Sequence, residues 1–198
     1  MERELVKISV RELVEFIMRS GDIDHRTGGK RDAESMLAGA KIHRKIQRSM
    51  GSDYHAEVSL KHLIPMEQFD LQVEGRADGI IDGNPVTIDE IKGIYKSLEY
   101  LNGPVPVHLA QAKCYAYIYG IQNQKKEMNI QMTYVNLDTE QKLYFNEYYS
   151  MDELAAYLVL SAMFELLNEY GENSNSPVWY YYDSKLTKQK PEFYPDYM

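Results

Sequence analysis

The sequence predicts a single α/β domain in which helices cover a central mixed β-sheet. Two observations support this class. Segments with helical spacing of apolar residues alternate with segments of strand-like alternation, and their order is helix, helix, three strands, helix, two strands, helix. The chain has 198 residues, of which 44% are hydrophobic and 26% charged. This is the composition of a globular protein that is large enough to bury a core.

The N-terminal part predicts two helices with a loop between them. Ser9 and Glu12 form a capping-box pattern at the start of VRELVEFIMRSG, in which Gly21 acts as a stop signal. The stretch DIDHRTGGKRD contains Gly-Gly and mixed charges, which predicts an exposed loop. A second helix is expected from Ala33 to about Met50, because apolar and small residues recur there at spacings of three and four.

Three strands are expected next, and they read HAEVSLKHLI, FDLQVEGRADGII and PVTIDEIKG, with the turn signal DGNP between the last two. Pro104 and Pro106 precede a helix expected from about Val107 to Gly120. MNIQMTYVNLD and QKLYFNEYY then predict a second pair of strands around the turn-like DTEQ. A last helix is expected from near Asp152 to near Tyr170. These elements predict a domain over residues 1–172, followed at 173–198 by an aromatic-rich tail or linker.

Charge and cysteine content narrow the function classes. The net charge of −8 argues against a general nucleic-acid coat protein, but an enzyme that holds divalent cations and contacts DNA along one basic strip stays open. Cys114 is the only cysteine, so the chain can form no internal disulfide and no cysteine cluster. The N-terminus is too charged for a secretory signal, and no apolar run approaches the ~20 residues that cross a bilayer. We therefore expect a cytoplasmic protein with no membrane partner.

One predicted strand carries charges at the end of an apolar face. Val86, Ile88, Glu90 and Lys92 share this face, because side chains alternate along a strand. A carboxylate and an ammonium in such a place are costly unless they are paired. A surface salt bridge between Lys92 and an acid is the simple explanation, and a cleft with a chemical role is the other.

Asp78, on the preceding strand, joins this face in only one of two registers. A two-residue connection would place Asp78 opposite Asp89, which has the wrong parity to join Glu90. A three-residue connection, or a bulge at Gly75 or Gly79, would bring Asp78, Glu90 and Lys92 to one face. Two carboxylates close together suit a hard cation such as Mg²⁺ or Mn²⁺.

Two helices add polar candidates. His43 lies on the apolar stripe of its helix, where it could be a satisfied core histidine or a ligand. The basic residues around it form a solvated face or a strip that faces phosphates, and they are Lys41, Arg44, Lys45 and Arg48. Gln111 and Tyr115 stand four residues apart on the third helix and therefore share one side. They either satisfy each other or present an amide and a hydroxyl to a phosphate or base.

The order of these elements resembles the RecB-like branch of the PD-(D/E)XK nuclease superfamily. The matching segments are GAKIH (39–43), GRAD (75–78), DEIKG (89–93) and QAKCY (111–115). That branch shows a histidine in a helix, an aspartate in a strand, an acid-x-Lys strand and a Gln-x-x-x-Tyr helix. The resemblance covers roughly residues 1–170 and implies a restriction-endonuclease-like core.

The resemblance also implies roles for the matching positions. The expected metal ligands are His43, Asp78, Glu90 and the main-chain carbonyl of Ile91, and Lys92 would be the catalytic lysine. Gln111 and Tyr115 would position DNA or active-site groups, with Arg44 and Lys41 beside them as DNA-binding candidates. Glu57 on the first of the three strands is a further candidate for a supporting acid.

The function expected from this resemblance is that of a DNA nuclease dependent on Mg²⁺ or Mn²⁺, an exonuclease or an enzyme directed to single strands or ends, in DNA repair or processing. Several members of the branch bind an iron–sulfur cluster through four cysteines, which a chain with Cys114 alone cannot do. The resemblance is strongest to nuclease-like modules at the N-terminus of some bacterial DinG/XPD-type helicases. No GxxxxGK(S/T) loop occurs, so a helicase motor would be a separate subunit or a domain beyond Met198.

Two alternatives remain open at this point. The domain could be a catalytically silent nuclease-fold module that binds DNA or docks a helicase partner. It could also be a metal-dependent hydrolase of a small phosphorylated substrate.

Overall fold

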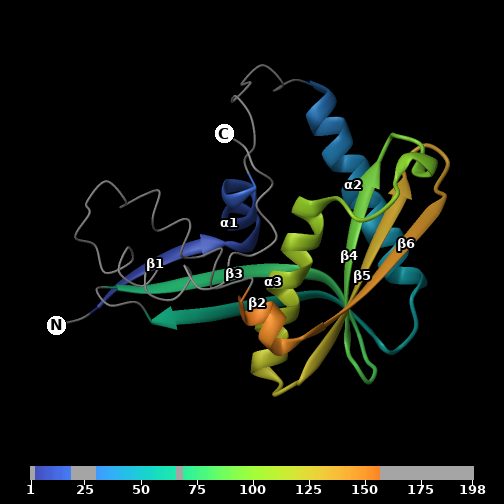
Figure 1. Cartoon of the computed structure of the whole chain (residues 1–198). Helices are drawn as coiled ribbons and strands as arrows, with labels where there is room; N and C mark the ends of the chain where they lie inside the picture. Colours follow the sequence, from blue (N-terminus) through green and yellow to red (C-terminus); the bar gives the residue numbers. More distant parts are fainter. Residues whose placement is uncertain (1–2, 19–29, 66–68, 157–198) are drawn as a thin grey trace, which may run out of the picture.

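The computed structural model of the chain describes residues 3–18, 30–65 and 69–156. Figure 1 shows a twisted sheet with helices packed against it. In chain order the elements are β1 (Glu4–Ser9), α1 (Val10–Ile17), α2 (Lys30–Ser49), β2 (Tyr54–Pro65), β3 (Phe69–Ile81), β4 (Thr87–Ile94), the 3₁₀ helix η1 (Leu98–Tyr100), α3 (Pro106–Gln122), β5 (Glu127–Asn136) and β6 (Lys142–Ser150).

The six strands form one mixed sheet. Its main path is β1-β3-β4-β5-β6, and β2 pairs with β3 outside this path. The β1–β3 and β4–β5 pairs are parallel, whereas β2–β3, β3–β4 and β5–β6 are antiparallel. The expected class, a mixed α/β fold consistent with a restriction-endonuclease-like core, is confirmed.

The sheet divides at the middle of β3 into one part that contains β1 and β2 and another that contains β4, β5 and β6. Strand β2 pairs with β3 along nearly its whole length, so β1 and β4 must share the other edge of β3. On that edge β1 pairs with residues 69–74 and β4 with residues 79–81. Residues 75–78 of β3 therefore have no partner there among the described strands. We call this opening the notch, and Figure 1 shows β4, β5 and β6 leaving it at a steep angle to β1, β2 and β3.

The helices cover opposite faces of the sheet beside the notch. On β4, Ile88 belongs to the main core with α1 and α3, whereas Ile91 packs with Ile42 and Ile46 of α2. Since successive side chains of a strand point to opposite faces, α3 and α2 lie on different sides. Figure 1 shows α3 in front of the strands and α2 passing behind them. A side chain from either helix can thus enter the notch.

Strand β1 was not expected from the sequence. Its six residues, ELVKIS, place Val6 and Ile8 against the main core in a parallel pairing with β3. The predicted capping box follows it at once. Ser9 Oγ accepts from the Glu12 amide at 3.1 Å, and Glu12 Oε2 accepts from the Ser9 amide at 3.1 Å. A short strand that ends in a helix cap gives little signal of its own.

The other boundaries differ by a few residues. β5 ends at Asn136, because the side-chain oxygen of Asn136 accepts from the amides of Asp138 and Thr139 and starts the turn. Residues 151–156 begin the expected last helix behind a Ser150–Glu153 capping box. The rest of that helix, most of the predicted loop before α2, the domain boundary at 172 and the tail at 173–198 lie outside the described residues. Within the described part of the chain, no helix is both long and apolar enough to cross a membrane.

Candidate active site

The register of the β3–β4 hairpin brings Asp78 to Glu90. The ladder pairs Gly79 with Asp89 and Ile81 with Thr87, and the connection comprises residues 82–86. One step further along this register, Asp78 stands opposite Glu90. The ladder stops there, and Asp78 Oδ2 accepts a hydrogen bond from the Ile91 amide at 2.8 Å. The carboxylate thus takes the place of the missing strand partner at the notch.

The strand alternation also breaks at Asp78. Ala77 and Ile80 both lie in the main core, although residues three apart in a regular strand face opposite sides. The facing strand shows the same break, because Glu57 lies opposite Asp78 between the pairs Ala56–Gly79 and Val58–Ala77. Glu57 has φ 57°. A non-glycine residue in this region carries strain on the order of 1–3 kcal/mol, and such positions concentrate at functional sites.

His43 enters the notch from α2. The neighbouring Ile42 and Ile46 are buried against the sheet, and this packing fixes which side of the helix faces the notch. His43 Nδ1 lies 3.2 Å from Asp78 Oδ1. Burial lowers the pKa of His43, but the hydrogen bond and the charge of Asp78 outweigh it, so the pKa is raised. The His43 imidazole and the Asp78 carboxylate thus lie within hydrogen-bond distance of each other, and this contact favours the protonated form of His43.

Glu90 and Lys92 form a second pair next to the first. Glu90 is only 1% exposed, and its Oε1 lies 2.8 Å from Lys92 Nζ. Its other oxygen, Oε2, has no hydrogen-bond partner among the described residues. Burial raises the pKa of Glu90 to about 7, although the charge of Lys92 acts in the opposite direction. A buried carboxylate with one unsatisfied oxygen is unfavourable on its own.

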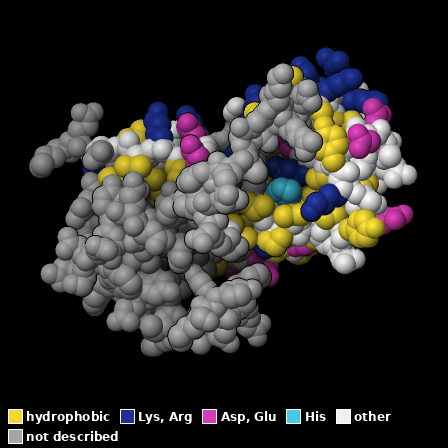
Figure 2. All heavy atoms as spheres, turned by 90° about the horizontal axis from the view of Figure 1, so that it is seen from above, with side chains coloured by type: hydrophobic (Ala, Val, Ile, Leu, Met, Phe, Trp, Pro, Cys, Tyr) yellow, Lys and Arg dark blue, Asp and Glu magenta, His cyan; other side chains and the backbone are white. Residues whose placement is uncertain are grey.

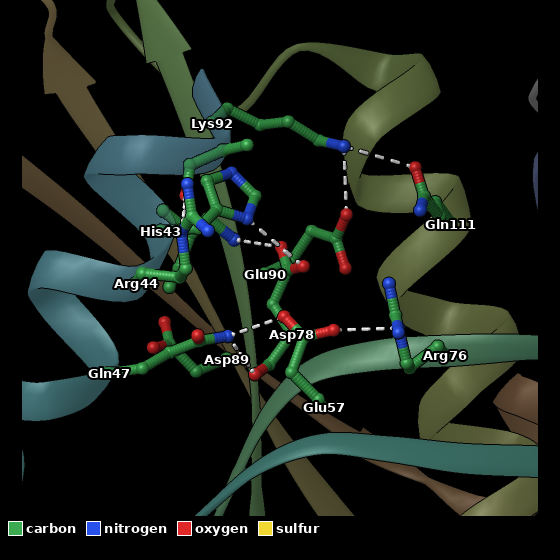
Figure 3. Close-up of polar contacts among 12 residues, drawn as sticks. His43, Arg44, Gln47, Glu57, Arg76, Asp78, Asp89, Glu90, Lys92 and Gln111 are labelled. Carbon is green, nitrogen blue, oxygen red and sulfur yellow. Dashed lines mark hydrogen bonds and ion pairs between the residues drawn. The ribbon is translucent and has the colours of Figure 1, made fainter. Parts of the chain in front are cut away.

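Helix α3 holds Lys92 from the other side. Lys92 Nζ donates to Gln111 Oε1 at 3.1 Å, and Gln111 Nε2 donates to the Tyr115 hydroxyl at 3.4 Å. Tyr115 lies over Gly75, where an added Cβ would come within 2.8 Å of its hydroxyl. Burial raises the pKa of Tyr115 to about 12, so it stays protonated. Figure 3 shows the Lys92 side chain extending toward α3, with its ammonium in contact with both Glu90 and Gln111.

These side chains meet, but they do not form a ready-made metal site. No three His, Cys, Asp or Glu side chains of the described residues are close enough together to hold an ion. In the described contacts, His43 is paired with Asp78 and Glu90 with Lys92. Ile91 contributes its amide, so a role for its carbonyl stays a prediction. The types of donor nevertheless suit a divalent cation, since they are two carboxylates and an imidazole, and one oxygen of the Glu90 carboxylate lacks a hydrogen-bond partner among the described residues.

The described polar contacts of the basic residues of α2 lie outside this cluster. Lys41 and Arg44 are exposed, and Arg44 Nε donates to the Ala40 carbonyl of its own helix. Lys45 forms an ion pair with Glu140. From above, Figure 2 shows Lys and Arg side chains gathered on the side of the molecule that carries α2 and the tips of β4 to β6. Neither Lys41 nor Arg44 has a described contact with the central side chains of the site, which are those of His43, Asp78, Glu90 and Lys92. A role of Lys41 and Arg44 in DNA binding therefore stays a prediction.

Sequence reasoning missed Gln47 and Arg76. Gln47 Nε2 donates both to Glu57 Oε1 at 2.8 Å and to the Asp78 carbonyl at 2.9 Å. Arg76 Nε lies 2.6 Å from Glu57 Oε2. Spacing could have found both residues, since Gln47 follows His43 by four positions on α2 and Arg76 precedes Asp78 by two on β3. Glu57, expected only as a supporting acid, is the residue that links them.

Asp89 is buried on the other face of the sheet, in agreement with its parity. It is 1% exposed and accepts hydrogen bonds from Tyr54, Gln131 and Thr133. Burial raises the pKa of Asp89, while these three donors act against the shift. The network ties β2, β4 and β5 together directly beneath the notch.

Comparison with known proteins gives likeness of fold. No family model matches the chain, and no curated protein matches it in sequence. Among solved structures, the crystal structure of SSO0001 has a TM-score of 0.53 at 18% identity, over 84% of this chain and 79% of that one. A "Putative exonuclease" from Eubacterium rectale has a TM-score of 0.34 at 13% identity, over 68% of this chain and 50% of that one. The likeness to SSO0001 is one of fold alone.

Proposed function

We propose that this chain is a divalent-metal-dependent DNA nuclease of the RecB-like kind, which hydrolyses phosphodiester bonds at the notch. One observation carries the proposal. The Oε2 atom of Glu90 is buried and has no partner among the described residues, next to Asp78 and His43. A fold tolerates such an atom at a cost of about 1–3 kcal/mol, and a bound cation would remove that cost.

The residues present fit Mg²⁺ or Mn²⁺. Carboxylate oxygens from Asp78 and Glu90 are the ligands that both ions prefer, and the imidazole of His43 shifts the preference toward Mn²⁺. The ion would take the place of the His43–Asp78 contact, and its binding would favour the deprotonated form of both ligands. When bound, the cation would supply charge stabilisation to the phosphate and lower the pKa of a water molecule.

The chain's own residues would then orient the reaction. Lys92 lies beside Glu90, where its ammonium can steady the attacking oxygen or the developing charge on the phosphate. Gln111 fixes the Lys92 ammonium by a 3.1 Å hydrogen bond, and Tyr115 in turn holds Gln111. We propose a single strand or a DNA end as the substrate.

The proposal extends to the setting of the enzyme. We propose a role in DNA repair or processing, with a helicase domain or subunit as the partner and residues 1–172 as the nuclease unit. Its sole cysteine, Cys114, is buried within α3, where burial raises the pKa of the thiol to about 12. We therefore propose that it works without an iron–sulfur cluster.

One observation favours a silent module as the second candidate. The four central side chains are already matched as two pairs, His43 with Asp78 and Glu90 with Lys92. A domain that only binds DNA or docks a helicase could use these pairs as structural links. Such a module would bind DNA or its partner without cleaving DNA. Mn²⁺ would not raise its melting temperature in a way that depends on Glu90.

Cleavage of a labelled single strand in Mn²⁺ tests the proposal. We expect Asp78→Ala and Lys92→Ala to lose about 100-fold or more of the wild-type rate, because each removes charge from the reacting centre. Asp82→Ala is the matched control, since Asp82 forms a His–Asp pair with His55 at 2.9 Å on the exposed hairpin. Equal rates in all four proteins would contradict the assignment. Inhibition by unlabelled DNA separates a nuclease from a hydrolase of small substrates.

A further inference from the structure

We infer that Arg76 binds a phosphate of the DNA strand next to the one that is cleaved, and that Glu57 holds Arg76 in position for it. The inference rests on the proposed function, since it names a further contact between the same site and its substrate. It is independent of the metal ligands, because neither residue is needed to hold the cation.

Both the backbone and the side chain of Arg76 are held by contacts. Its backbone hydrogen-bonds the Tyr115 hydroxyl, which belongs to the chain of contacts that holds Lys92. Its side-chain Nε lies 2.6 Å from Glu57 Oε2. In Figure 3 the guanidinium of Arg76 lies at the α3 side of the notch, on the same side of β3 as Asp78 and Glu90. The residue therefore presents its charge at the entrance to the site.

The free edge of the guanidinium suits a phosphate. Glu57 engages Nε, and no hydrogen bond is described for the two terminal nitrogens of Arg76, whose side chain is 67% exposed. A guanidinium offers these donors in a rigid fork that matches two oxygens of one phosphate. Lys92, the other cation of the notch, is engaged by Glu90 and Gln111. Arg76 is thus the cation best placed to meet a phosphate beside the reacting one.

The contacts of Glu57 indicate a positioning role. Gln47 from α2 donates to Glu57 Oε1, so Glu57 links α2 to Arg76 across the notch. Its backbone is held at φ 57°, which is unfavourable for a glutamate in a strand. An ordinary surface ion pair contributes little and gives no reason to retain such strain. Orientation of Arg76 toward a substrate supplies the reason.

The chain offers a matched control pair on α1. Arg11 Nε lies 2.6 Å from Glu15 Oε1, and the Arg11 side chain is 72% exposed. The two arginines therefore have the same ion-pair distance and similar exposure, but Arg11 is held by an i,i+4 pair of its own helix. Both Arg76→Ala and Arg11→Ala remove one positive charge and one Arg–Glu ion pair. A difference in DNA affinity between these two variants would therefore be due to the position of the arginine.

The experiment measures binding of a fluorescein-labelled single-stranded oligodeoxynucleotide by anisotropy in EDTA, over a series of salt concentrations. Each phosphate contact on a single strand contributes about −0.7 to the slope of log K against log salt. We expect Arg76→Ala to make this slope shallower by about 0.7 and to weaken binding by about tenfold. Arg76→Lys should keep the slope, because it keeps the charge, and Arg11→Ala should match wild type.

The outcomes separate the inference from the proposed function. The role of Arg76 would be overturned if the wild-type protein binds DNA and the slope of log K against log salt is the same for Arg76→Ala as for wild type and Arg11→Ala. That result would leave the nuclease proposal intact. No binding by wild type, together with no cleavage in Mn²⁺, would overturn both. A shallower slope in Arg76→Ala that Arg76→Lys restores supports the phosphate contact even if the protein does not cleave DNA.

Discussion

Replacing Gly79 by alanine should destabilise the fold through a single contact beneath the notch. An added Cβ at Gly79 would lie 1.9 Å from the Tyr54 hydroxyl and 2.0 Å from its Cζ. Ordinary contacts begin at 3.4 Å, so the end of the tyrosine ring would have to move by about 1.5 Å. That shift breaks the 3.0 Å hydrogen bond from Tyr54 to Asp89, which is buried and keeps only two other donors.

The magnitude follows from two losses. Overpacking of a core position costs about 1–3 kcal/mol, and a hydrogen bond to a charged group contributes about 1.5–3 kcal/mol. We therefore expect Gly79→Ala to lower the free energy of unfolding by about 3–5 kcal/mol. Gly79 does not need a positive φ, so the backbone itself accepts alanine.

A background series isolates the cause. In Tyr54→Phe the ring remains and the hydrogen bond is already absent, so Gly79→Ala should cost only about 1–3 kcal/mol. In Tyr54→Ala the clash is gone, and the same change should be neutral or stabilising by up to about 1 kcal/mol. Urea unfolding followed by circular dichroism measures all three values. An equal cost of Gly79→Ala in the three backgrounds would refute the reasoning.

Two further predictions concern the surroundings of the site. Asn136→Ala should lower the free energy of unfolding by about 2–4 kcal/mol. The buried Asn136 side chain forms hydrogen bonds with backbone groups of both the β5–β6 turn and the segment after β4, and the substitution would remove them. A urea midpoint unchanged from wild type would contradict this prediction. His108 shares a 3.2 Å contact with the Tyr134 hydroxyl, and burial, with the charge of Lys92, lowers the pKa of His108 to about 4. As the pH falls, His108 is protonated in the unfolded chain at about pH 6.5 but in the folded chain only near pH 4. The free energy of unfolding therefore decreases as the pH drops from about 6.5 to 4. His108→Gln should remove up to about 2 kcal/mol of that fall after allowance for partial exposure, and superimposable acid limbs of the two stability–pH curves would exclude the role of His108.

Much of the fold was predictable, because each long element has its own local signal. The capping box at Ser9 and Glu12 marks the start of α1, and the prolines before α3 mark its beginning. Strand β1 escaped prediction because six residues that run into a helix cap carry too little periodicity. Its place is set by pairing with β3, in which Glu4 meets Phe69, 65 positions further along the chain, and no local pattern encodes this pairing.

The gathering of the candidate site depended on a register that the sequence left open. Parity placed Glu90 and Lys92 on one face and Asp89 on the other, but Asp78 could join either. The connection over residues 82–86 decides for Glu90. The roles of these residues stay proposals, whereas their proximity is a property of the fold.

The network of Gln47, Glu57 and Arg76 could not have been predicted as a unit. It depends on a break in alternation at Asp78 and on the left-handed backbone of Glu57. Both lie where β2 and β3 pass the point at which β4 leaves β3. Such a feature arises from tertiary pairing, and a glutamate within a strand-like segment gives no sign of it.

The most direct test of the account is the binding of Mn²⁺ to the protein without DNA. Electron paramagnetic resonance of free Mn²⁺ gives the affinity, and the variants are Glu90→Gln, which keeps the shape and removes the charge, and Asp82→Asn as the control. We predict that wild type and Asp82→Asn bind Mn²⁺ alike and that Glu90→Gln binds at least about tenfold more weakly. Binding by Glu90→Gln that equals wild type, or a free Mn²⁺ signal that wild type leaves unchanged, would contradict the proposed metal site.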